Sequence, residues 1–143
     1  MRQHAVLIGY GRAGSRTLRA LKKRGIEFVV VDEDAGVIRK LIAEGIPCVH
    51  GDGSDPRTLK RAHCREARAV FCSMRRTRDA QTALNYLKDV PTEVLVRVFE
   101  TSEEDQVRLA GGQPVQTADA AAEQFLRWAD VNLGELNKGT LTC

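Results

Sequence analysis

Short apolar runs alternate along the chain with longer segments in which apolar residues recur every three or four positions. The short runs predict strands at residues 5–8, 28–31, 47–50, 69–72 and 94–98, and a sixth near residue 115. The longer segments predict helices, among them 13–24, 80–87, 102–110 and 118–131. Strands that are apolar on both faces and alternate with helices form a parallel sheet covered on both sides. We therefore expect an α/β fold built on a doubly wound parallel sheet of six strands.

The apolar positions within the predicted helices identify the faces that should pack on this sheet. The expected inward positions are Gly14, Thr17, Leu18 and Leu21, then Val37, Ile38, Leu41 and Ile42, and later Ala80, Ala83, Leu84 and Leu87. The basic residues Arg16, Arg19, Lys22 and Lys23 should point to water. Gly45 should end the second helix, and Asp55 should cap a helix that begins at Pro56.

The length of the chain suits one ordinary domain. Its 143 residues, 43% hydrophobic and 29% charged, can bury a core but leave no room for a separate substrate domain. We expect this domain to cover residues 1–131 and residues 132–143 to form a polar tail or the start of a linker. A net charge of +3 with mixed signs is weak evidence for nucleic-acid binding. No apolar stretch approaches the roughly 20 residues that span a bilayer, so we expect a cytoplasmic protein without direct membrane insertion.

The cysteines give no sign of disulfides. Cys48, Cys64, Cys72 and Cys143 lack C-x-x-C spacing, so we expect free thiols, with Cys72 buried as a small hydrophobic residue. A zinc site built from Cys48, His50, His63 and Cys64 is an alternative. The adjacent His63 and Cys64 do not give the usual ligand spacing, and we expect no metal.

Three glycines mark a candidate phosphate site. Gly9, Gly11 and Gly14 form G-x-G-x-x-G where strand 5–8 passes into helix 13–24. Glycine at these positions allows a tight turn and lets the backbone approach a pyrophosphate that lies on the helix N-terminus. Arg12, in the first helical turn, either reaches a phosphate or remains a solvated surface arginine.

An acidic residue follows at the distance that a Rossmann-type site requires. Asp32 ends the second strand 18 residues after Gly14, where a carboxylate can accept hydrogen bonds from ribose hydroxyls. Asp52 and Gly53, after the third strand, lie at the same carboxyl edge of the sheet, on the expected adenosine side. The alternatives are structural: a tight glycine turn, a helix cap at Asp32, and an ordinary turn at Asp52 and Gly53.

The segments that carry these residues resemble a known family. IGYGRAGSRTLRAL, VVVDED, VHGDGSDPRTLKRA, ARAVFCSM and VLVRVFE are similar to the N-terminal RCK domain, the regulator of potassium conductance, also called KTN or TrkA-N, over residues 4–130. The resemblance implies a cytoplasmic regulatory domain that binds NAD(H), ATP, ADP or AMP and controls a potassium channel or transporter. It also implies a homodimer or larger ring that meets a membrane subunit, peripherally at the inner membrane.

The resemblance also implies which residues border the nucleotide. The glycine segment would surround the phosphates, Asp32 would bind ribose, and Asp52 and Gly53 would border the adenine. Cys72 to Met74 would line the opposite wall, and Arg97 would reach toward the phosphates. The expected binding residues are Gly9, Tyr10, Gly11, Arg12, Ala13, Gly14, Asp32, Glu33, Gly51, Asp52, Gly53, Cys72, Ser73, Met74, Arg97 and Asp119, and no catalytic residue is expected.

Two features depart from the family pattern. Arg75, Arg76 and Arg78 stand where acidic or polar residues are usual, and they either add phosphate contacts, engage an acidic partner or form a solvated basic loop. The family's C-terminal ligand-binding lobe is absent, so the sequence is either a stand-alone subunit or a cut domain.

An NAD-dependent oxidoreductase, or its isolated cofactor-binding domain, is the main alternative function, because this fold also serves dehydrogenases. Hydride transfer needs a surface that holds the substrate, commonly with a proton donor. No motif places His4, His50 or His63 in the cleft, so we expect binding without catalysis.

The last predicted helix carries an apolar stripe. Its members are Ala118, Ala121, Ala122, Phe125 and Ala129, with Trp128 beside them. We expect part of this stripe to pack on the domain and the remainder to contact a second copy in a symmetric dimer.

Overall fold

A six-stranded parallel sheet runs through the centre of the protein. The computed structural model describes residues 2–74, 76–117 and 125–132, and within these it describes Arg12 and Ala13 by their backbone only. The strands lie in the order β3-β2-β1-β4-β5-β6, and every pairing is parallel. Their bounds are β1 (Ala5–Ile8), β2 (Phe28–Asp32), β3 (Cys48–His50), β4 (Ala69–Cys72), β5 (Glu93–Val98) and β6 (Gln113–Gln116). The predicted doubly wound sheet is confirmed.

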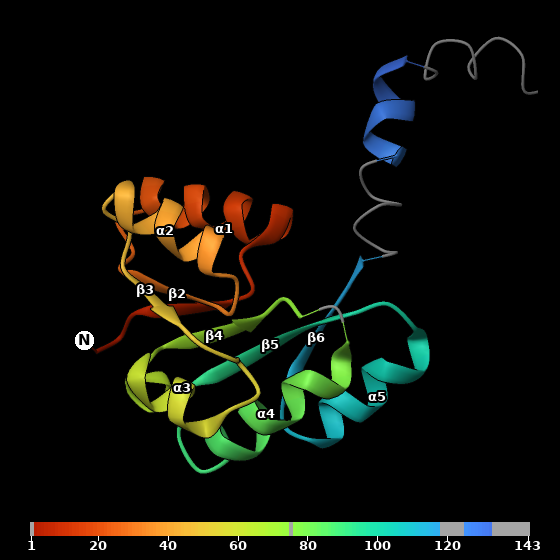
Figure 1. The fold of residues 1–143 in the computed structure, drawn as a ribbon. Helices are drawn as coiled ribbons and strands as arrows, with labels where there is room; N and C mark the ends of the chain where they lie inside the picture. The colour runs from red at the N-terminus through yellow and green to blue at the C-terminus, as the bar shows by residue number, and fades with distance from the viewer. Residues whose placement is uncertain (1, 75, 118–124, 133–143) are drawn as a thin grey trace, which may run out of the picture.

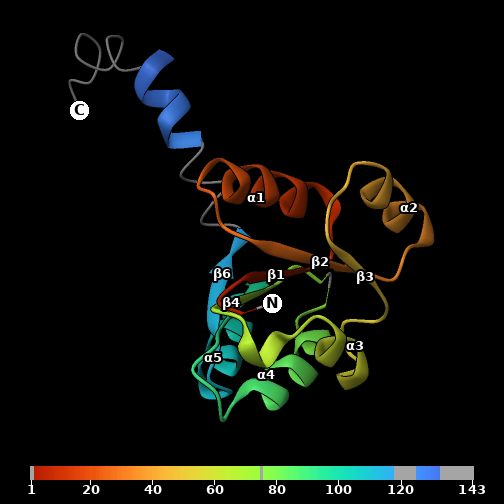
Figure 2. The ribbon, with the colours of Figure 1, turned by 90° about the vertical axis from the view of Figure 1, so that its left-hand side faces the viewer.

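Helices cover both faces of the sheet. On one face lie α1 (Gly11–Lys23) and α2 (Ala35–Ala43), and on the other lie α3 (Pro56–Arg61), α4 (Gln81–Leu87) and α5 (Thr101–Leu109) (Figures 1 and 2). Short 3-10 helices precede β4 and α4, namely η1 (Cys64–Glu66) and η2 (Thr77–Ala80). Residues 125–132 are also helical.

Each face of the sheet has its own core, because successive side chains of a strand point to opposite faces. On the α1–α2 side the buried residues are Leu7, Leu18, Phe28, Val30, Leu41 and Ile46. On the other side Val6 and Ile8 of β1 pack with Val70 of β4 and Val96 of β5. A slip of one residue in strand register would move each set to the wrong face. The two cores therefore fix the position of each strand end, which is where the candidate site lies.

The inward faces of the helices largely follow the sequence pattern. Gly14 and Leu18 are buried, as are all four predicted positions between Ala80 and Leu87. Ile42 is an incorrect prediction, because its side chain is 64% exposed. The buried face of α2 is centred on Ile38 and Leu41, and the 100° step to the next residue turns Ile42 toward solvent.

The thiols also follow the prediction where the structure describes them. Cys48, Cys64 and Cys72 are free, and Cys143 lies outside the described residues. Burial raises the pKa of Cys64 and of Cys72 to about 12, so neither carries a reactive thiolate at neutral pH. Among the described helices, none has the length and apolar character needed to cross a membrane.

Candidate functional site

The strand order reverses between β1 and β4, and two loops meet at their carboxyl ends. The N–H of Gly9 donates to the carbonyl of Val31 at 2.8 Å, and the N–H of Ser73 donates to the carbonyl of Ile8 at 2.9 Å. A Cβ added to Gly9 would lie 3.3 Å from the carbonyl oxygen of Ser73. Gly9 and Ser73 therefore border the switch point, where open α/β sheets bind ligands.

The glycine segment packs the first turn of α1 against the end of β1. A Cβ at Gly14 would lie 2.7 Å from the carbonyl oxygen of Gly9, which is closer than real Cβ contacts come. A larger residue at this position would push the helix away from the loop. The first N–H groups of a helix have no partner within the helix, and here they lie at the carboxyl edge of the sheet. Such a group of N–H donors attracts an anion.

The carboxylate of Asp32 connects the end of β2 to the glycine segment. Its Oδ2 accepts a hydrogen bond from the N–H of Tyr10 at 2.9 Å, and its Oδ1 accepts one from the N–H of Asp34 at 2.8 Å. The cap of α2 is Asp34, whose Oδ1 accepts from the N–H of Gly36 at 2.7 Å. The alternative in which Asp32 caps α2 is thus wrong. Each carboxylate oxygen has a second lone pair, so Asp32 can accept further hydrogen bonds.

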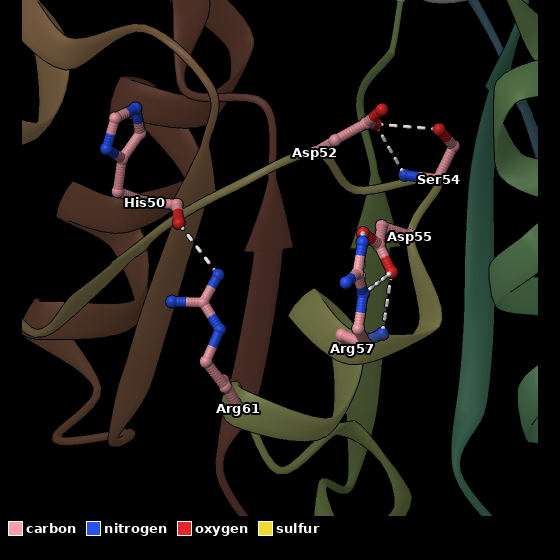
Figure 3. A network of polar contacts seen from close by, with 6 residues as sticks. All are labelled: His50, Asp52, Ser54, Asp55, Arg57 and Arg61. Carbon is pink, nitrogen blue, oxygen red and sulfur yellow. Dashed lines mark hydrogen bonds and ion pairs between the residues drawn. The ribbon is translucent and has the colours of Figure 1, made fainter.

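The loop between β3 and α3 is held in shape by its own polar contacts (Figure 3). Oδ1 of Asp52 accepts from the N–H of Ser54 at 2.8 Å and from its hydroxyl at 2.7 Å. Asp55 caps α3 by accepting from the N–H of Arg57 at 2.9 Å, as predicted, and hydrogen bonds from Arg57 lower the pKa of this carboxyl. Arg61 donates to the carbonyl of His50 at 2.8 Å. These bonds hold Asp52 at the carboxyl edge of the sheet.

Two predicted site residues from different loops meet over the end of β1. A Cβ at Gly53 would overlap Cγ2 of Ile8 and would come within 3.4 Å of Cε of Met74. Only glycine lets the loop after β3 pass so close to β1. Gly53 and Met74 therefore lie together beside the switch point, whereas the resemblance placed them on opposite walls of the crevice.

Cys72 does not line this crevice with its side chain. It is 1% exposed and belongs to the core on the α3–α5 side. Side chains alternate along β4, so Phe71 points away from that core while Cys72 points into it. Only the backbone of Cys72 can border a ligand, which corrects the expectation from sequence.

Arg97 presents an unpaired guanidinium at the carboxyl end of β5. Its guanidinium carbon lies 4.9 Å from the ring centroid of Phe99, and its Nε is buried without a hydrogen-bond partner. None of the ion pairs among the described residues includes Arg97. A buried donor without a partner is costly, and a guanidinium is well suited to bind a phosphate.

His50 is a neighbour of Asp32 that the motifs did not reveal. The register of β2 and β3 pairs these two residues, so their side chains point to the same side of the sheet. The Nε2 of His50 lies 3.0 Å from the carbonyl oxygen of the exposed Glu33. The signal in the sequence was the position of each residue at the end of its strand, but only the register shows that they are adjacent.

A second feature missed by sequence reasoning joins the loops after β4 and β5. Oε1 of Glu103 accepts from the N–H of Phe99 at 3.0 Å and from that of Glu100 at 2.9 Å, which forms a capping box at the start of α5. The nearby Thr77 hydroxyl and the hydrogen bonds from these two N–H groups hold the pKa of Glu103 below its usual range. The segment that carries Thr77 therefore lies beside the N-terminus of α5.

The structure gives no side-chain position for several predicted site residues. Asp119 and Arg75 lie outside the described residues, while Arg12 and Ala13 are placed only by their backbone, in the first turn of α1. Arg76 and Arg78 are exposed. The assignment of the complete set to a nucleotide stays a prediction.

The glycine segment, the acid at the end of β2 and the parallel sheet can be compared with known proteins. The sequence model of the family described as the TrkA-N domain matches residues 5–117. The chain belongs to the TrkA-N domain family. This confirms the resemblance identified from the sequence.

Relatives of this TrkA-N chain include named potassium-transport proteins. It is 29% identical over 119 residues to a protein designated K(+) efflux antiporter KefB of Alkalimonas amylolytica, a match that covers 80% of this chain and 18% of that protein. It is 28% identical over 127 residues to the Trk system potassium uptake protein TrkA of Streptomyces coelicolor, covering 87% of this chain and 57% of that one. The TrkA-N chain thus spans less than two thirds of either relative.

Solved structures share the fold. The TrkA-N domain of the inner membrane protein ybaL from Escherichia coli has a TM-score of 0.83 and 23% identity, over 90% of this chain and 97% of that one. The GsuK channel bound to NAD has a TM-score of 0.72 and 25% identity, over 80% of this chain and 21% of that one.

Proposed function

We propose that this TrkA-N chain is a nucleotide-sensing regulatory unit of a potassium channel or transporter. In this proposal NAD(H), ATP, ADP or AMP binds in the crevice between the carboxyl ends of β1 and β4. The observation that carries the proposal is the carboxylate of Asp32, which lies hydrogen-bonded to the glycine segment beside the first turn of α1. A protein group that can bind ribose is thus expected beside one that can bind phosphate, which is the arrangement that a nucleotide requires.

The described residues suit each part of such a ligand. The N–H donors at the start of α1 would bind the phosphates, and the unpaired guanidinium of Arg97 would approach them from β5. Asp32 would accept hydrogen bonds from the ribose hydroxyls. Asp52 and Gly53 would border the adenine from the loop after β3, and Ser73 and Met74 would border the ligand from the loop after β4. The buried Nε of Arg97 supports this arrangement, because a phosphate would supply the partner that it lacks.

Regulation would follow from the way one ligand contacts several loops. Asp32 reaches the β1–α1 loop through Tyr10, and Arg97 belongs to β5 on the far side of the switch point. A nucleotide that contacts both would stabilise one relative arrangement of the two halves of the sheet. A ligand shifts a conformational equilibrium by its difference in affinity for the two states. A nicotinamide or a terminal phosphate would make that difference depend on the nucleotide bound.

We propose that the site binds nucleotide without turnover. His4 is fully buried and its Nε2 lies 3.0 Å from the carbonyl oxygen of Ala62, at the amino edge of the sheet. His63 lies between α3 and β4 at the same edge. His50 is the histidine at the carboxyl edge, and its ring is engaged by the carbonyl of Glu33. A regulatory role needs no proton donor at this place.

The working form proposed for the chain is a cytoplasmic homodimer or larger ring, associated at the inner membrane with a transport subunit. On the α1–α2 side, Phe71, Leu95 and Val115 of β4, β5 and β6 are only half-buried. Phe125 and Trp128 in the helical segment 125–132 expose 64% and 54% of their surface, with ring centroids 6.2 Å apart. Apolar surface of this kind supports contact with a second copy.

The experiment that tests the proposal starts with the ligand that the purified protein retains, identified by native mass spectrometry. Titration calorimetry should then show saturable binding of NADH, and competition by ATP, ADP and AMP, because all share the adenosine half. Absence of binding by all four, with the fold intact by circular dichroism, would contradict the proposal.

A further inference from the structure

A concave groove of about 560 Å³ runs between α1 and α2, beside the proposed nucleotide crevice. It begins beside Tyr10 and Gly11 and follows α1 toward its C-terminal end at Lys22. Across the groove, α2 contributes Val37 and Lys40. The groove thus starts at the carboxyl edge of the sheet and leads away from it.

The charged side chains of α1, the helix on one side of this groove, are all positive. The segment Gly11–Lys23 contains five basic residues and no acidic residue, although the whole chain has a net charge of only +3. The basic members are Arg12, Arg16, Arg19, Lys22 and Lys23. This helix therefore has an excess of positive charge that exceeds the net charge of the whole chain.

Three cations line the groove itself, namely Arg19, Lys22 and Lys40. In the part of the chain that the structure describes, none of them belongs to an ion pair, whereas Arg57, Arg65 and Arg108 elsewhere do. Lys22 and Lys40 stabilise the C-terminal ends of their helices through the helix dipole, but Arg19 has no such role. The acidic residue of the lining is Glu44, so the charge of the groove is positive.

Between the cations the groove has apolar walls. The accessible apolar surface comes from Val37 and Tyr10, which are half-buried, and Leu18 and Ile46 lie beneath them with only 4% and 7% of their surface exposed. Apolar walls between flanking cations match a segment that presents an apolar stripe flanked by carboxylates. An amphipathic helix with that pattern lies in a groove through residues spaced three or four positions apart.

We propose that the α1–α2 groove docks an acidic, amphipathic segment of a partner protein. Charge complementarity identifies the occupant, since the cations that line the groove lack acidic partners within the described chain. An anionic membrane is the less suitable occupant, because basic amphipathic surfaces that insert into bilayers present their apolar side chains outward. Here Leu18 and Ile46 lie at the bottom of a concavity and cannot enter a bilayer.

The groove also adjoins the proposed nucleotide site. Tyr10 lines the groove, while its N–H is held by Asp32. A docked segment that orders Tyr10 would stabilise the same loop that a nucleotide contacts, and such coupling is reciprocal. The docking proposal does not require this coupling, and its test measures peptide binding without nucleotide.

The test uses two synthetic peptides of about 14 residues, roughly four helical turns. One carries a leucine stripe flanked by glutamates, and the other has lysine in place of each glutamate. Fluorescence anisotropy with the full chain should show saturable binding of the glutamate peptide alone. Arg19→Glu and Lys40→Glu, one on each wall, should each weaken it by about tenfold or more. The matched control is Lys23→Glu, which makes the same charge change on α1 outside the groove lining and should weaken binding much less.

Three results would overturn the proposal. The first is no saturable binding of the glutamate peptide. The second is an equal loss in Lys23→Glu, which would indicate nonspecific attraction to a basic helix. The third is binding to phosphatidylglycerol vesicles that Arg19→Glu abolishes while the glutamate peptide does not bind, which would assign the surface to a membrane. Circular dichroism on each variant excludes unfolding, and NADH binding reports separately on the proposed nucleotide site.

Discussion

The carboxylate of Asp32 accepts a hydrogen bond from the N–H of Tyr10 at 2.9 Å, across 22 positions of sequence. One side chain therefore shapes the glycine segment and also presents a negative charge where a ribose would lie. Its second oxygen holds the N–H of Asp34 at 2.8 Å, so the direction of the carboxylate is fixed from two sides. A group held in place before the ligand arrives loses little entropy on binding.

This position of Asp32 predicts selectivity for NAD(H) over NADP(H). A carboxylate accepts hydrogen bonds from ribose hydroxyls but repels a 2′-phosphate. At about 4 Å and an effective dielectric near 20, each unit of repulsion is on the order of 4 kcal/mol before screening. A quarter of that approaches the roughly 1.4 kcal/mol that changes affinity tenfold. Titration calorimetry should therefore show that NADH binds at least about tenfold more tightly than NADPH.

Variants at Asp32 separate its charge from its hydrogen bonds. Asp32→Ala should weaken NADH binding by about 1–3 kcal/mol, the cost of losing a charged hydrogen-bond partner, and should narrow the gap to NADPH. Asp32→Asn keeps one acceptor oxygen, enough for the N–H of Tyr10 or of Asp34 but not for both, so it should retain more NADH affinity than Asp32→Ala while losing the discrimination. Equal or tighter binding of NADPH by the unmodified protein would refute this role for Asp32.

The fold and the centre of the site could be predicted because they depend on local patterns. The glycine motif, Asp32 and the alternation of strands with helices are each visible within short windows of sequence. The direction of a side chain at the sheet edge depends instead on register and on rotation of the element. Cys72 points into the core, and His50 lies beside Asp32, for that reason. Thr77 lies beside Glu103 but comes from a segment more than twenty residues earlier, so no local pattern reveals that proximity.

The close approach of Gly53 to Ile8 predicts an effect on stability. A Cβ at Gly53 would overlap Cγ2 of Ile8, so Gly53→Ala should lower the free energy of unfolding by about 1–3 kcal/mol, the usual cost of overpacking. Urea denaturation measures this change. Ile8→Leu removes the Cγ2 branch at similar volume, and Gly53→Ala should cost less in that background. An equal cost in both backgrounds would show that this contact is not the cause.

The exposed aromatic residues of segment 125–132 predict assembly. Light scattering at micromolar concentration should show a dimer or larger species, because Phe125 and Trp128 expose most of their surface in a single chain. Trp128→Glu should shift the equilibrium toward monomer. Arg127→Glu adds the same negative side chain to a neighbouring position and serves as the control. A wild-type protein that is monomeric throughout this range would contradict the prediction.

Nucleotide binding is expected without turnover. Common aldehydes, ketones and hydroxy acids, screened at the nicotinamide absorbance band, should give no steady change with NAD(H). The histidines other than His50 lie at the amino edge of the sheet, far in the fold from the glycine segment. Steady turnover that disappears in both Asp32→Ala and His50→Gln would instead favour an oxidoreductase, with His50 as its proton donor.

The capping box at α5 predicts a pH-dependent contribution to stability. The Thr77 hydroxyl and the N–H groups of Phe99 and Glu100 hold the pKa of Glu103 below its usual range. A group whose folded pKa is lowered stabilises the fold above its unfolded pKa, about 4.3 for glutamate, and loses this contribution as the pH falls through the folded value. Glu103→Gln should therefore cost about 0.3–1 kcal/mol at neutral pH, the usual worth of an acid at a helix N-terminus.

Thermal melts between about pH 7 and pH 3 decide the point, because they cover the unfolded pKa near 4.3. The difference in Tm between wild type and Glu103→Gln should be largest at neutral pH and should shrink as the pH falls below the unfolded value. Thr77→Val removes the hydroxyl beside Glu103 and should move the acid-side loss of stability to higher pH. The control Glu27→Gln, an exposed change outside any helix, should leave the profile unchanged. A constant difference between wild type and Glu103→Gln across the range would mean that the ionised form of Glu103 has no special stabilising role.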